Sequence, residues 1–167
     1  SPHLATQLAA LQRAAASDAP ILVLGDPGTG RSALARALQA SSPRSGSPLV
    51  EVDPGSLPAA LFESELFGHR AGAFTGAERA QLGRVARADG GTLLLDHVEE
   101  LPLGSQPKLL RLLAERRYAP LGGVETAADV RSICLWRSLI SRYFTWKLRQ
   151  NAPRSQRASG RPSASAR

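Results

Sequence analysis

The stretch ILVLGDPGTGRSALARAL, residues 21–38, joins a short apolar run, a glycine-rich turn and a helix-forming segment. Ile21–Leu24 predict a buried strand, and Ser32–Leu38 predict a helix. Glycines in the turn permit backbone angles closed to other residues, so consecutive N–H groups can converge on one anion. The N-terminus of the helix, with its free amides and positive dipole end, would face the same anion.

The spacing G-x-x-x-x-G-x-S is that of a phosphate-binding P-loop, and it predicts a nucleotide site. The predicted nucleotide-binding residues are Gly25, Asp26, Pro27, Gly28, Thr29, Gly30, Arg31 and Ser32. Arg31 departs from the pattern, which has lysine there. Guanidinium is planar and wider than a compact ammonium group, so the geometry of triphosphate binding would differ. The alternative is a glycine-rich turn that only caps a helix.

Composition limits the class of protein. A chain of 167 residues predicts one domain, and no apolar run approaches the roughly 18 residues of a membrane span. We therefore expect a soluble, cytoplasmic protein without membrane contact. The single cysteine, Cys134, excludes an internal disulfide. The chain contains no methionine, which indicates a fragment or an excised domain.

Helical and strand patterns alternate along the chain. We expect helices at 3–16, 57–67 and 105–117 and strands at 49–53, 92–95 and 129–131, besides the elements of residues 21–38. Strands that alternate with helices are typical of parallel pairing with helical crossovers. The fold class predicted is α/β, with a parallel sheet and helices on both faces.

A glycine-flanked excursion follows the helix at 57–67. Phe74 lies in its middle, and an aromatic side chain on a flexible loop favours docking to a partner. The alternative is a turn whose phenylalanine packs inward.

The segment ESELFGHRAGAFTGA, residues 63–77, resembles the signature of the AAA+ ATPase domain of bacterial enhancer-binding proteins, the activators of sigma-54 RNA polymerase. GDPGTGR at 25–31 resembles that family's first nucleotide motif, and residues 88–113 resemble its Walker B region and the helix that follows. The resemblance covers residues 1 to about 131.

The resemblance implies a P-loop NTPase of the AAA+ class that binds ATP and Mg²⁺. It further implies a homo-oligomeric ring that acts on the sigma-54 RNA polymerase holoenzyme, with DNA contacted only indirectly. The residues implied to contact the sigma factor are Gly72, Ala73, Phe74, Thr75, Gly76 and Ala77.

Asp96 ends the apolar strand at 92–95, where a carboxylate at the sheet edge could hold Mg²⁺ together with Ser32. The alternative is that Asp96 only forms a turn. His97 stands where the family has its catalytic glutamate, and Asp53 stands where it has the asparagine that contacts that glutamate. An Asp53–His97 hydrogen bond would orient the imidazole and raise its basicity. Alternatively, both positions drifted because hydrolysis was lost, and this interpretation predicts impaired ATP hydrolysis.

Charged residues are distributed unevenly along the chain. Residues 1–131 hold 13 basic and 14 acidic residues, whereas residues 132–167 hold 8 basic residues and no acid. We expect a partial AAA+ domain at 1–131, lacking the C-terminal part of the core and the helical lid. Residues 132–167 would be a disordered tail, produced by a shift of reading frame near Ser132.

The alternative for the tail is nucleic-acid binding, because basic and aromatic side chains alternate in it. The residues that would bind are Arg137, Arg142, Lys147, Arg149, Trp136, Tyr143, Phe144 and Trp146.

Overall fold

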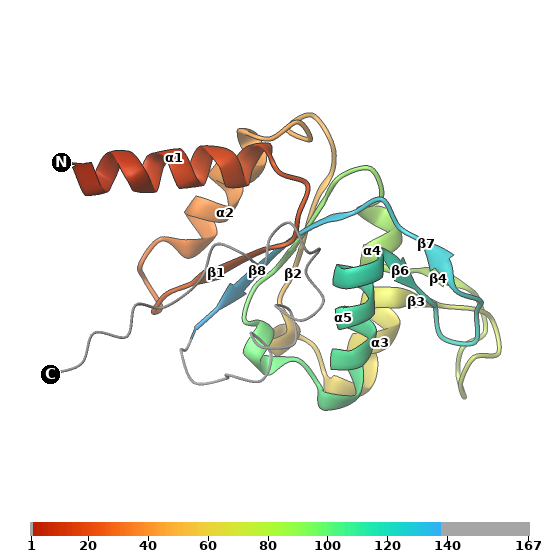
Figure 1. Cartoon of the computed structure of the whole chain (residues 1–167). Helices are drawn as coiled ribbons and strands as arrows, with labels where there is room; N and C mark the ends of the chain where they lie inside the picture. The colour runs from red at the N-terminus through yellow and green to blue at the C-terminus, as the bar shows by residue number, and fades with distance from the viewer. Residues whose placement is uncertain (1, 138–167) are drawn as a thin grey trace, which may run out of the picture.

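The computed structural model describes residues 2–137, which build a four-stranded parallel sheet (Figure 1). The strands in chain order are β1 (Ile21–Leu24), β2 (Leu49–Val52), β5 (Thr92–Leu95) and β8 (Arg131–Trp136). Across the sheet their order is β1-β8-β5-β2. All three pairings are parallel, so the C-terminal ends of the strands meet at one edge.

Two helices cover one face of the sheet, α1 (Pro2–Ala16) and α2 (Arg31–Ala40). Their buried residues Ala15, Ala35 and Leu38 pack with Leu94 of β5 and with Ile133 and Leu135 of β8 in one apolar cluster. The opposite face carries α3 (Ala59–Phe67), α4 (Arg84–Arg87) and α5 (Gln106–Glu115). The larger core cluster forms there, around residues such as Phe62, Leu66 and Leu109.

Side chains of the strands alternate between the two clusters, as the period of two in a strand requires. Leu93 and Leu95 belong to the larger cluster, while Leu94 between them belongs to the smaller one. Both faces are therefore buried, which is why the strands read as continuous apolar runs. The predicted parallel sheet with helices on both faces is confirmed.

Two short hairpins extend from one end of the molecule (Figure 1). The first pairs β3 (Gly68–His69) with β4 (Gln81–Leu82), and the second pairs β6 (Arg117–Tyr118) with β7 (Thr126–Ala127). A bridge between His69 and Leu121 joins them. Three 3₁₀ turns complete the described chain: η1 (Pro54–Ser56), η2 (Val98–Glu100) and η3 (Leu103–Ser105).

Most predicted elements agree with the observed ones to within two residues at each end. The helix expected to reach residue 117 ends at Glu115 instead. Arg116 adopts a left-handed backbone with φ 53°, and Arg117 enters β6. No helix within residues 2–137 has the length and apolar character that crossing a bilayer requires.

The boundary expected after Arg131 falls inside β8 (Arg131–Trp136). β8 continues to Trp136, and all six of its residues are buried between β1 and β5. Ile133, Cys134, Leu135 and Trp136 are apolar, so they fit a strand covered on both faces. The rest of the expected tail, residues 138–167, lies outside the described residues.

Candidate functional site

The glycine-rich turn lies between the end of β1 and the start of α2. Gly28 and Gly30 adopt left-handed angles, with φ 80° and 84°. Thr29 closes the turn, because its N–H and its hydroxyl both donate to the carbonyl of Asp26, at 3.3 and 2.7 Å. Gly30 is the N-cap of α2, and no side chain in the described chain caps that end. The first amides of α2 are therefore available to an anion.

Arg31 is the first residue of α2, and its side chain folds back over the turn. A Cβ built on Gly25 would lie 3.3 Å from Cγ and Cδ of Arg31, so the arginine occupies space that only glycine leaves open there. Arg31 is only 9% exposed. Its Nη1 is buried and has no hydrogen-bond partner within residues 2–137. A buried guanidinium N–H without an acceptor favours an anionic ligand.

Ser32 and Asp96 are 64 positions apart in sequence but meet at the C-terminal edge of the sheet. The Ser32 hydroxyl donates to Oδ2 of Asp96 at 3.3 Å. The N–H of Asp96 donates to the Val52 carbonyl at 2.9 Å, which fixes the end of β5 beside β2. A hydroxyl and a carboxylate at the end of a parallel strand are oxygen donors of the kind that Mg²⁺ prefers. Within residues 2–137 no cluster of three or more His, Cys, Asp and Glu side chains forms a metal site by itself.

Asp53 and His97 also lie at this edge. Nδ1 of His97 is 3.5 Å from Oδ1 of Asp53 and 3.8 Å from Oδ1 of Asp96. His97 has a left-handed backbone, φ 50°, and its N–H donates to Oδ1 of Asp96 at 2.9 Å. Oδ1 of Asp53 accepts the Gly55 N–H at 3.0 Å, as the cap of η1. The two side chains are thus close enough for the contact that the sequence suggests, and its effect on reactivity stays a prediction.

Two further residues, Trp136 and Glu99, reach this edge, although the sequence did not place them at the nucleotide site. The carbonyl of Trp136 accepts the Gly25 N–H at 3.3 Å, so β8 supports the start of the turn. Glu99 accepts the Arg137 N–H at 3.2 Å through Oε2, while its Oε1 is buried without a partner in the described chain. The sequence predicted a strand at 129–131, and the observed strand runs further along the chain, over Arg131–Trp136.

The loop Gly72–Ala77 lies between β3 and β4. Gly72 and Gly76 have positive φ, 79° and 96°, and the loop closes on itself through a 2.7 Å bond from the Gly72 N–H to the Ala77 carbonyl. Phe74 is 42% exposed, and its ring meets that of His69 edge-on, with centroids 5.0 Å apart. Phe74 is thus neither fully exposed nor packed fully inward, because its ring is partly packed against His69 and partly open to solvent.

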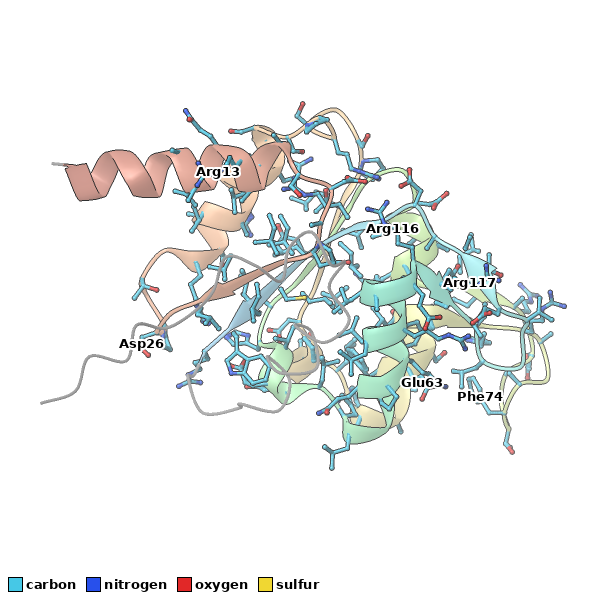
Figure 2. All side chains as sticks on the ribbon, viewed as in Figure 1. Arg13, Asp26, Glu63, Phe74, Arg116 and Arg117 are labelled. Atoms are coloured by element: carbon cyan, nitrogen blue, oxygen red, sulfur yellow. The ribbon has the colours of Figure 1, made fainter. Side chains whose placement is uncertain are left out.

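The glycine-rich turn and the loop Gly72–Ala77 are far apart. Figure 2 shows Asp26 of the glycine-rich turn at one end of the molecule and Phe74 at the other. The sheet and the helices α3 and α5 lie between them (Figure 1). Any influence of one on the other must pass through the body of the domain.

The parallel sheet, the glycine-rich turn that opens α2, and Asp96 beside Ser32 define a P-loop NTPase domain. Residues 1–150 match the sigma-54 interaction domain family, and the chain belongs to it. The match extends past residue 131, where the sequence resemblance was expected to end.

Curated relatives agree with this assignment. The chain is 50% identical over 132 residues to the alginate biosynthesis transcriptional regulatory protein AlgB of Pseudomonas aeruginosa, covering 78% of this chain and 29% of AlgB. It is 48% identical over 136 residues to the DNA-binding transcriptional activator HyfR of Escherichia coli, covering 78% of this chain and 20% of HyfR. The chain thus spans less than a third of the length of these relatives.

Solved structures show the same fold. The crystal structure of NtrX from Brucella abortus superimposes with a TM-score of 0.75 at 26% identity, over 89% of this chain and 35% of that one. NtrX in complex with ATP gives a TM-score of 0.74 at 26% identity, over 89% of this chain and 34% of that one.

Proposed function

We propose that this chain is an ATP- and Mg²⁺-binding domain of a sigma-54-dependent transcriptional regulator, and that it hydrolyses ATP poorly or not at all. In the same proposal, the loop Gly72–Ala77 contacts the sigma-54 RNA polymerase holoenzyme. The observation that carries the nucleotide part is the buried Nη1 of Arg31, without a partner in the described chain, beside the uncapped N-terminus of α2.

The start of α2 and Asp96 have distinct roles in this proposal. The amides that follow Gly30 would donate to phosphate oxygens, and Arg31 would supply the charge that lysine supplies in the usual pattern. Ser32 and Asp96 would hold Mg²⁺, which neutralises phosphate charge when bound. The complexes of Brucella abortus NtrX with ADP and with ATP support nucleotide binding by a related domain.

Impaired hydrolysis is inferred from His97. A catalytic base must orient or deprotonate the attacking water, and an imidazole differs in reach and charge from the glutamate that the family has at this position. Nδ1 of His97 lies 3.5 Å from Asp53 and 3.8 Å from Asp96. Its backbone is also held in a left-handed conformation by the bond to Asp96. Loss of a positioned base typically lowers the rate by about 10²- to 10⁴-fold.

The partner contact is inferred from the exposure of Phe74. A half-exposed aromatic ring on a closed glycine loop is suited to insertion into a partner surface. The family name supports sigma-54 as that partner. A ring of several copies and the assembled polymerase are parts of the proposal that the family suggests.

Nucleotide binding can be tested with the full 167-residue chain, a fluorescent ATP analogue and Mg²⁺. Arg31→Ala should weaken binding by at least about tenfold, because a charge-assisted bond to phosphate is removed. Arg36→Ala is the matched control, since this arginine lies on the same helix but pairs with Glu51 at 2.8 Å. Equal affinities of Arg31→Ala and the unmodified chain would show that the turn does not bind phosphate.

Partner binding can be tested with purified sigma-54 and the same chain in the presence of a nucleotide analogue. Phe74→Ala should reduce capture of sigma-54, whereas Val124→Ala should not. Val124 is a suitable control because it is an exposed apolar residue of the other hairpin. Equal capture by both variants would rule out the proposed contact.

A nucleic-acid-binding tail is the second candidate, because residues 132–167 carry 8 basic residues and no acid. One of its predicted stacking residues is excluded, since Trp136 is buried at the end of β8. The other aromatic residues of that set lie outside the described chain. Salt-dependent binding of the full chain to DNA would support this candidate.

A further inference from the structure

The sequence gives His69 no role, but the structure makes it the junction of four segments. Its backbone pairs with Gln81 of β4 and bridges to Leu121 of the β6–β7 connection. Its ring lies within hydrogen-bonding distance of Ser64 on α3, with Nδ1 2.7 Å from the hydroxyl oxygen. The ring also meets Phe74 of the glycine loop, at a centroid distance of 5.0 Å and an interplanar angle of 64°.

Burial distinguishes His69 from an incidental neighbour of Phe74. Both His69 and Ser64 are buried, so the hydrogen bond between them is shielded from water and fixes the imidazole plane. The loop of Phe74 is held by backbone bonds, among them one from the Gly72 N–H to the Ala77 carbonyl and one from the Ala77 N–H to the Phe74 carbonyl, and these bonds do not fix the Phe74 side chain. The contact with the imidazole is therefore the ring contact that can limit the position of Phe74.

A cavity of about 370 Å³ adjoins this contact. Leu61, Ser64, His69 and Phe74 are among the residues that line it. Phe74 thus packs against His69 on one side while space remains beside it, which leaves the ring free to move if the imidazole contact is lost.

We propose that His69 is a positioning residue for the loop Gly72–Ala77: its imidazole packs edge-on against Phe74 and sets how far this side chain projects. The proposal rests on the contact role assigned to Phe74 above. Its test, however, measures only how accessible the loop is to protease and needs no sigma factor.

Two substitutions separate the ring contact from the hydrogen bond. His69→Gln keeps a polar group that can reach Ser64 but removes the aromatic ring. His69→Phe keeps a ring beside Phe74 but cannot bond to Ser64. If the ring contact positions the loop, His69→Gln should release it and His69→Phe should keep it packed.

Trypsin can measure the release, because the exposed residues Arg70 and Arg79 flank the loop. Cleavage of the full chain after these two arginines, followed by mass spectrometry, should become about two- to tenfold faster in His69→Gln, as loss of one aromatic pair predicts. His69→Phe and the control Val124→Ala should be cleaved like the unmodified chain. Phe74→Ala should match His69→Gln, and the double variant should be no faster than either, because both remove the same contact.

Folding can be monitored with ring-labelled phenylalanine, since Phe62 and Phe67 are buried in the core. Their NMR signals should stay unchanged in every variant that is compared. If the NMR signals show that His69→Phe is not folded like the unmodified chain, the double-mutant cycle of His69→Gln and Phe74→Ala tests the proposal without it. Unchanged cleavage in His69→Gln, or additive effects in the double variant, would overturn the proposal. If the variants are cleaved as expected but the unmodified chain does not capture sigma-54, the result would count against the proposed function alone.

Discussion

Arg31 and Cys134 show how burial changes what a single side chain can do. Arg31 has a buried guanidinium Nη1 with no acceptor in the described chain, and such an unpaired polar group is costly. The cradle of glycines and free amides around it offers that acceptor only when an anion is present. Cys134 is the opposite case, because a thiol can remain neutral and needs no partner.

Burial raises the pKa of the Cys134 thiol to about 12. At pH 8 the native thiolate fraction should be about a thousandfold below that of a thiol with the ordinary value of 9.0, so labelling by a thiolate-specific reagent should be slower by a similar factor. Cys134 is the only cysteine, so the signal has one source. Labelling in urea is the control, and native labelling at the rate of the unfolded chain would contradict the buried position.

The site residues could be predicted from sequence to different degrees. The spacing of the turn predicts Ser32 beside the anion, and the strand that ends in Asp96 predicts a carboxylate at the same edge. The structure brings these two together at 3.3 Å. His69 could not be found in this way, because its contacts come from separate elements and follow no spacing rule.

At the level of elements, β8 is the strand that the sequence predicted only at 129–131, because the composition of the tail concealed its continuation to Trp136. The basic, low-complexity character of residues 152–167 dominates any average over the tail. The strand needs only five residues beyond Arg131, and the apolar side chains of the last four, residues 133–136, are enough to fill the gap between β1 and β5. Composition reports on long segments, whereas strand pairing is decided by a few residues.

Leu135→Ala tests the place of β8 in the fold. Leu135 is 0% exposed and packs in the cluster between the sheet, α1 and α2. Its truncation should lower the free energy of unfolding by about 2–5 kcal/mol, as for other buried leucines. Leu82→Ala is the matched control, because Leu82 is 71% exposed and should change stability by less than about 0.5 kcal/mol. Equal, small effects in urea denaturation would exclude β8 from the core.

A cluster of ion pairs joins the ends of several elements near Asp18. Arg44 bonds to Asp18 at 2.8 Å and to Asp129 at 2.6 Å, and Arg116 bonds to Asp18 at 3.1 Å. The hydrogen bond from Arg44 is the main cause of a lowered pKa at Asp18. Because the folded pKa lies below the unfolded value near 3.8, the pair stabilises the fold above that pH and loses its effect as pH falls through the folded pKa.

Asp18→Asn should therefore destabilise the chain at pH 7 but make its stability less dependent on pH below about 4. Arg44→Ala should produce the same flattening, since it removes the main partner. Thermal unfolding between pH 2 and pH 7 measures both effects. A variant that loses stability in acid as steeply as the unmodified chain would show that Asp18 does not contribute.

For the molecule as a whole, the parallel architecture followed from the alternation of strand and helix patterns, because each crossover must return to the same edge of the sheet. That edge carries the glycine turn, Asp53, Asp96 and His97. The hairpins lie at the far end, and the sequence did not predict them, because each strand has only two residues. Such short pairings are fixed by contacts with their neighbours rather than by a pattern of their own.

The central claim is a domain that binds ATP without turning it over. The most direct measurement combines Mg²⁺-dependent ATP binding with phosphate release by the same preparation of the full chain. We predict saturable binding that Arg31→Ala weakens, with turnover well below the order of 1 per second that enzymes of modest activity reach. Saturable binding with turnover of about 1 per second or faster would contradict the account, and so would the absence of any binding.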